Sequence, residues 1–84
     1  MEFEEFIELE EIIQNFVDSL YKEYAIQLIV KFNRAVLGYD NTHSLYEYYV
    51  YFDGEVYDMI CLLWNISEQK VENIISFRAC KGIL

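Results

Sequence analysis

The chain has 84 residues, and its 15 Asp and Glu against 6 Lys and Arg give a formal net charge of −9. A field of one sign this strong repels nucleic acid and attracts cationic surfaces, which argues against direct binding of DNA or RNA. Hydrophobic residues make up 55% of the chain and aromatic residues 18%, which excludes a disordered acidic tail. We therefore expect one folded domain over residues 1–84.

The charges are segregated along the chain. Residues 1–21 hold seven carboxylates and residues 35–69 hold six, and neither stretch contains a Lys or Arg. All six bases lie in residues 22–34 and 70–81. This order favours an acidic surface with a specific use over charge that serves only solubility, which remains the simpler alternative.

The sequence gives no sign of export or membrane insertion. Its acidic start lacks the basic region of a signal peptide, and no run approaches the ~20 apolar residues of a membrane span. Two cysteines, Cys61 and Cys80, fit reduced thiols better than the disulfide framework of a small secreted domain. A cytoplasmic protein with no membrane contact is expected.

Residues 2 to about 22 are predicted to form an amphipathic helix. Its apolar face repeats at three- and four-residue spacing through Phe6, Leu9, Ile13, Phe16 and Leu20. Its opposite face carries Glu4, Glu8, Glu11 and Asp18. Because like charges four residues apart cost a few tenths of a kcal/mol, roughly, a helix selected for stability alone would include lysines here.

Strands are predicted after the helix. Residues 24–33 alternate apolar and polar side chains apart from Ile29, and residues 38–44 are expected to be a loop. Asp53-Gly54 is a two-residue hairpin signal between long runs rich in Tyr, Val and Ile. With that turn, Val50 would lie opposite Tyr57 on one face, and Tyr49 opposite Asp58 on the other.

Residues 68–81 allow two interpretations. A strand is favoured, and a helix capped by Ser67 is the alternative. If Ile66 pairs with Val71, then Cys61 lies opposite Ser76 and too far from Cys80 to form a disulfide. The predicted fold is α+β, with the N-terminal amphipathic helix packed on a three- or four-stranded antiparallel sheet.

The last two strands place apolar groups on both faces of the sheet. Met59, Cys61, Leu63 and Ile74 are expected on one face, and Ile60, Leu62, Trp64, Ile75 and Phe77 on the other. One helix covers one face only, so the other is expected to be an interface for a homodimer or a partner. A one-residue shift in register would exchange the two faces, so the sequence does not decide which face the helix covers.

Catalytic and cofactor-binding patterns are missing from the sequence. His43 is the only histidine, and we expect it to be a solvated loop residue. The nearby carboxylate of Asp40 is the only sign that His43 could act as a general base. There is no cysteine–histidine cluster for zinc, no glycine-rich phosphate loop and no calcium loop. We expect neither an enzyme nor a bound cofactor or metal.

The acids and the tyrosines of the hairpin together predict a protein-binding surface. Carboxylates pair with Lys and Arg, and a Tyr ring adds rigid apolar area, a hydroxyl and a face for cations. The candidate partner-binding residues are Glu4, Glu8, Glu11, Glu47, Tyr49, Tyr51, Asp53, Glu55, Tyr57 and Asp58. Such a surface can compete for a nucleic-acid channel lined with Lys and Arg.

In size, charge and lack of catalytic residues, the chain resembles phage-encoded inhibitors of the anti-CRISPR and DNA-mimic kind. The resemblance concerns the whole chain and rests on no shared motif. It implies inhibition of a basic nuclease or other nucleic-acid-handling enzyme in the cytoplasm of a bacterial host, with the candidate carboxylates as surrogate phosphates. An immunity protein or antitoxin against a nuclease toxin is one alternative, and a structural homodimer is another.

Overall fold

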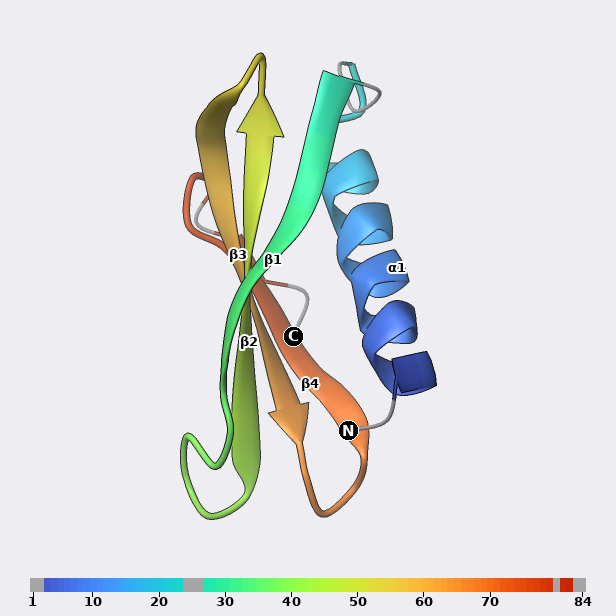
Figure 1. Cartoon of the computed structure of the whole chain (residues 1–84), viewed down its shortest axis with the longest axis vertical. Helices are drawn as coiled ribbons and strands as arrows, with labels where there is room; N and C mark the ends of the chain where they lie inside the picture. Colours follow the sequence, from blue (N-terminus) through green and yellow to red (C-terminus); the bar gives the residue numbers. More distant parts are fainter. Residues whose placement is uncertain (1–2, 24–26, 80, 83–84) are drawn as a thin grey trace.

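A computed structural model describes the backbone of residues 3–23, 27–79 and 81–82, and the side chains of residues 7–23 and 27–79. The elements, in chain order, are α1 (Phe3–Leu20), β1 (Leu28–Val36), β2 (His43–Phe52), β3 (Glu55–Asn65), β4 (Lys70–Ser76) and the short β5 (Lys81–Gly82). The strands form one antiparallel sheet in sequence order, and α1 lies beside it (Figure 1). The predicted α+β fold is confirmed.

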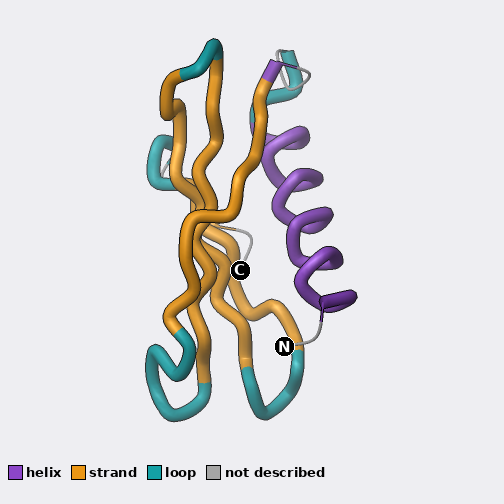
Figure 2. Tube along the Cα trace, in the orientation of Figure 1, coloured by secondary structure: helices purple, strands orange, loops and turns teal. Residues whose placement is uncertain are grey.

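The helix covers a single face of the sheet. Leu9, Ile13 and Val17, spaced four residues apart, are buried on α1 and form the helix side of the core. The sheet side of the core consists of Leu28, Tyr46, Tyr48, Val50, Ile60, Leu62 and Ile74. Figure 2 shows α1 on one side of the strands and, among the described residues, no helix or further sheet on the other.

The first strand lies further along the chain than the sequence predicts. β1 begins at Leu28 and continues to Val36, whereas residues 24–26, where we expected it to start, lie outside the described residues. The loop that follows ends earlier than expected, since β2 already begins at His43. Leu28 is buried in the core, as the alternation predicts.

The hairpin turn is at the predicted place. Asp53 and Gly54 have φ angles of 51° and 81°, the positive values that a two-residue turn of this kind needs. Phe52 pairs with Glu55. A β-bulge then makes Tyr57 an extra residue, so that Val50 pairs with Asp58. The predicted pairing of Val50 with Tyr57 is therefore wrong.

The bulge exchanges the faces of the residues that follow it. Tyr49 pairs with Met59, not with Asp58 as expected, so Asp58 lies on the face covered by α1. None of the three residues left out of the register, Asn33, Tyr57 and Glu72, is a glycine that would have revealed the irregularity in the sequence.

The last long segment is a strand, as favoured. Its register differs from the expected one, because Val71 pairs with Trp64 and a second irregularity follows. Cys61 consequently lies opposite Ile75 and not Ser76. Ile74 packs in the core and Ile75 lies on the uncovered face, the reverse of the expectation. Cys61 is a free thiol, and Cys80 lies outside the described residues.

Candidate protein-binding surface

The outward face of α1 carries an uncompensated row of carboxylates. The side chains of Glu8, Glu11 and Asp18 are exposed on this face, and Glu10 is exposed on the flank towards β1. The helix has no basic residue in its last turn. Among the side chains that the structure describes, no ion pair involves a carboxylate of α1. Glu4 belongs to the first turn of the helix, and its side chain lies outside the description. The row is thus available to cationic groups of another molecule.

A shallow hollow of about 230 Å³ lies along the flank of this row. Glu10, Glu11 and Gln14 line it from the helix, together with Ile7, and Val30 lines it from β1. Carboxylates and apolar groups therefore meet at one place. Such a site suits the long apolar stem and charged head of a Lys or Arg side chain.

Two further predicted acids lie at the tip of the hairpin. Asp53 and Glu55 are exposed at the β2–β3 turn, at the upper end of the molecule in Figure 1. Because Leu28 pairs with Phe52, this tip is at the same end of the molecule as the start of β1. The tip and the row on α1 are two separate acidic regions.

Glu47, by contrast, is occupied within the molecule. It is 7% exposed and forms a bidentate ion pair with Arg34 of β1, whose Nε lies 2.6 Å from Oε2 and whose Nη2 lies 3.3 Å from Oε1. The hydrogen bond from Arg34 lowers the pKa of the Glu47 carboxyl. A carboxylate neutralised in this way is poorly suited to bind a partner.

Tyr49 and Tyr51 lie on the uncovered face, away from α1. They are half-buried, and their rings meet edge to face with centroids 6.2 Å apart. The ammonium of Lys31 lies 5.9 Å from the centroid of Tyr51. We expected these tyrosines to lie beside free carboxylates, but the structure places them against each other and against Lys31.

Asp58 is the centre of a buried hydrogen-bond network, with only 4% of its surface exposed. Its Oδ2 accepts hydrogen bonds from the Tyr21 hydroxyl at 2.8 Å and from the Ser76 hydroxyl at 2.5 Å. Its Oδ1 accepts from the backbone N–H groups of Met59 at 2.7 Å and Arg78 at 2.9 Å. Burial and the adjacent Asp58 raise the pKa of Tyr21 to about 12. Asp58 thus ties the connection after α1 to the chain that follows β4.

Tyr57, the bulged residue, belongs to the same assembly. Its ring centroid lies 5.2 Å from that of Tyr21, and the guanidinium of Arg78 lies 3.9 Å from it. Of the hairpin residues chosen from the sequence, Tyr57, Asp58 and Glu47 therefore have evident roles in holding the fold together.

His43 is not the solvated loop residue that we expected. Its side chain is 17% exposed and lies between two carboxylates, with Nδ1 3.0 Å from Oδ1 of Asp40 and Nε2 against Glu72 of β4. Hydrogen bonds to both carboxylates raise the pKa of His43. The pKa of Asp40 is lowered to about 2, chiefly by the backbone N–H of Thr42. The register that brings Glu72 to His43 could not be read from the sequence.

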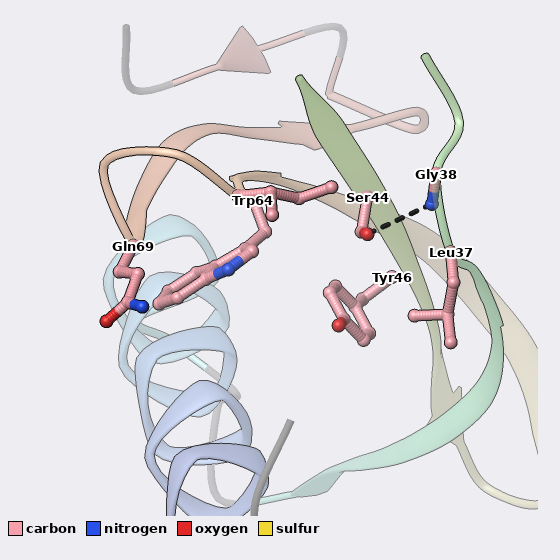
Figure 3. Close-up of a pocket in the computed structure, with 7 residues that line it drawn as sticks. Leu37, Gly38, Ser44, Tyr46, Trp64 and Gln69 are labelled. Atoms are coloured by element: carbon pink, nitrogen blue, oxygen red, sulfur yellow. Dashed lines mark hydrogen bonds between the residues drawn. The ribbon is translucent and has the colours of Figure 1, made fainter. Parts of the chain in front are cut away.

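A second hollow, of about 290 Å³, lies at the end of the sheet near His43 (Figure 3). Leu37, Gly38, Ser44, Tyr46, Trp64, Ile66 and Gln69 line it. The hydroxyl of Ser44 accepts a hydrogen bond from the backbone N–H of Gly38 at 3.2 Å. No histidine or carboxylate is among these lining residues, so they supply no base to activate that hydroxyl.

Within the described part of the chain, no group of three or more His, Cys, Asp or Glu side chains is placed to hold a metal ion. In the same residues, no helix has both the length and the hydropathy needed to cross a bilayer. Comparison with protein-family models, with curated proteins and with solved structures found no match for this chain.

Proposed function

We propose that this protein is a non-enzymatic inhibitor that binds a basic nucleic-acid-handling protein and occupies its nucleic-acid-binding surface. The observation that carries the proposal is the outward face of α1, where Glu8 and Glu11 are exposed, with Glu10 exposed on the flank towards β1. None of the three has an ion-pair partner among the described side chains. With Asp18, the row from Glu8 is about 15 Å long along the helix axis, at 1.5 Å per residue.

Unpaired carboxylates on a helix that packs against the core lower the stability of the fold, so their presence indicates a function. Glu8 and Glu11 are neighbours on the helix surface, and repulsion between them opposes folding. A partner lined with Lys and Arg removes this repulsion on binding and is attracted over long distances by the net charge of −9. The carboxylates of α1 thus contribute both to the binding energy and to the rate of association with the partner.

The hollow beside the row supplies contact that charge alone does not give. Its apolar groups, Ile7 and Val30, can pack against the stem of a Lys or Arg while Glu10 and Glu11 pair with the charged head. Arginine is favoured at such places because it forms two parallel hydrogen bonds with a carboxylate. We expect one arginine of the partner to occupy this hollow.

The binding set is accordingly centred on Glu4, Glu8, Glu10 and Glu11, with Asp53 and Glu55 of the hairpin tip acting at long range. The helix row is sparser than duplex DNA, which carries one charge per ~1.7 Å of axis. A partial replacement of the phosphate backbone, and not an imitation of a whole duplex, is what this number of carboxylates supports.

The test begins with a pull-down from bacterial lysate at low salt, using this protein as bait and short DNA or RNA as the eluting competitor. A basic protein released by nucleic acid is the expected result. A partner that stays bound would indicate an immunity-type contact outside the channel. Recovery of the bait alone would contradict the proposal.

Two matched double variants then separate contact from net charge. Glu8→Lys with Glu11→Lys, and Glu23→Lys with Glu68→Lys, change the net charge equally at exposed positions, and the second pair lies outside the proposed binding set. Long-range steering is thus weakened to a similar extent in both. We expect the helix pair to lose affinity by at least about 100-fold, as for central charged contacts, and the other pair by less than about 5-fold. Equal losses would show that only net charge matters.

A further inference from the structure

The face of the sheet opposite α1 is apolar and has no covering layer among the described residues (Figure 2). Its residues alternate along each strand with the core residues. The pairs on this face include Tyr49 with Met59, Leu45 with Leu63, and Cys61 with Ile75. Val56 and Ile75, at 56% and 37%, are among its exposed apolar side chains. A face that exposes large apolar side chains around the ion pair of Arg34 with Glu47 is typical of an interface. We propose that a second copy of this chain packs on it, sheet against sheet.

Charge on this face favours a copy of the same chain over a basic partner. The charged groups here are already matched: Glu47 is paired with Arg34, Glu72 with His43, and Lys31 lies over the ring of Tyr51. A basic protein would find no free carboxylate among them. A second copy brings the same surface, so burial leaves neither Glu47 nor Glu72 without its partner.

The area of the face is sufficient for a specific dimer. β2, β3 and β4 contain 10, 11 and 7 residues, and β1 contains 9. At ~4.8 Å between strands and ~3.3 Å per residue, four such strands cover roughly 500 to 600 Å² in projection. Side-chain relief raises the accessible area above the projected one. Specific interfaces bury about 600 to 1,000 Å² per partner, so burial of the whole face reaches the lower end of that range.

The same geometry solves the problem of repulsion between two chains of net charge −9. The exposed carboxylates of α1 lie on the layer that faces away from the proposed interface. With sheets ~10 Å apart and each helix ~10 Å from its own sheet, the two helix axes are separated by about 30 Å. Because charges are screened over ~8 Å at physiological salt, the two acidic rows barely interact. The dimer presents them outward, in opposite directions.

Two isoleucines of equal exposure give a matched test. Ile75 on the uncovered face and Ile12 on α1 are each 37% exposed, and each is changed to Lys. Light scattering and sedimentation velocity on the full chain, up to about 200 μM, measure the dimer. We expect the unchanged chain and Ile12→Lys to be dimeric, and Ile75→Lys to dissociate at least about 100-fold more readily, since symmetry places the substitution in the interface twice.

Circular dichroism verifies that each variant is folded. Should Ile75→Lys fail to fold, Val56→Lys replaces it, because that side chain is more exposed and is expected to be tolerated. A monomeric wild-type chain at 200 μM, or a dimer that Ile12→Lys disrupts and the uncovered-face variants do not, would overturn the proposal. A change from 50 to 500 mM NaCl should leave the dimer intact while it releases a partner held by α1, so the two proposals can fail separately.

Discussion

The carboxylates of α1 and those of the sheet are the same chemical group in opposite situations. On α1, Glu8 and Glu11 are exposed and have no ion-pair partner among the described side chains. In the hairpin, Asp58 receives four hydrogen bonds and Glu47 is held by Arg34. Net charge therefore says little about which acids can bind a partner, because a chain this acidic also uses carboxylates to stabilise its fold.

The largest effect is expected for Asp58→Ala. The hydroxyls of Tyr21 and Ser76 and two backbone N–H groups would lose their buried acceptor, at a cost of about 3 to 5 kcal/mol in the free energy of unfolding. Urea denaturation measures the change. Asp58→Asn, which keeps one acceptor oxygen for the two N–H groups, should lose about half as much. A loss below 1 kcal/mol for the alanine variant would contradict the assigned role of the network.

An intermediate effect is expected for Glu47→Gln, compared with the same substitution at Glu11. Glu47 loses the charge of a largely buried carboxylate that Arg34 holds, and unfolding should become easier by about 1 kcal/mol. Glu11→Gln removes an exposed charge from the helix and should change stability by less than about 0.5 kcal/mol. Equal effects in urea denaturation would show that the two glutamates are not used differently.

A smaller effect, dependent on pH, is expected for His43→Gln. Asp40 and Glu72 raise the pKa of His43, so its contribution is complete below the ordinary value of 6.5 and is lost as the pH rises through the folded pKa. Asp40, with a pKa of about 2, contributes above its ordinary value of 3.8 and loses that contribution only as the pH falls towards 2. The advantage of the wild-type chain over the variant should therefore be greater at pH 5.5 than at pH 8.5. Urea midpoints at the two pH values check this, and a constant difference would contradict it.

The smallest effect is expected for Glu8→Gln. Removing one of two neighbouring like charges on the helix should raise stability by a few tenths of a kcal/mol, roughly, and the gain should disappear in 1 M salt. Thermal unfolding at low and high salt measures both. A loss of stability would mean that Glu8 has a stabilising partner after all.

Local patterns were enough to predict the helix and the hairpin turn, and they favoured a strand over a helix for residues 68–81. The spacing of Leu9 and Ile13 fixes the buried face of α1, and Asp53-Gly54 fixes the turn through its positive φ angles. The exposed acids of α1 follow from the same periodicity. Each of these depends on residues near one another in the sequence.

The three irregularities of register, at Asn33, Tyr57 and Glu72, could not be predicted, and most errors at the site follow from them. The extra residue at Tyr57 turns Asp58 into the core, and the irregularity within β4 exchanges Ile74 and Ile75. The pair of Arg34 with Glu47 and the position of His43 depend on the register between strands that are distant in sequence. No local preference determines such a register, because the packing of the whole sheet selects it.

The bulge at Tyr57 also makes this position different from its neighbours in genetic terms. Loss of the single codon for Tyr57 would leave Tyr51 opposite Val56 and Val50 opposite Asp58, as they are now, because the register aligns no residue of β2 with Tyr57. Loss of a codon at Met59 would instead turn every later side chain of β3 to the other face. The hairpin can therefore change its length at one point without exchanging its inside and its outside.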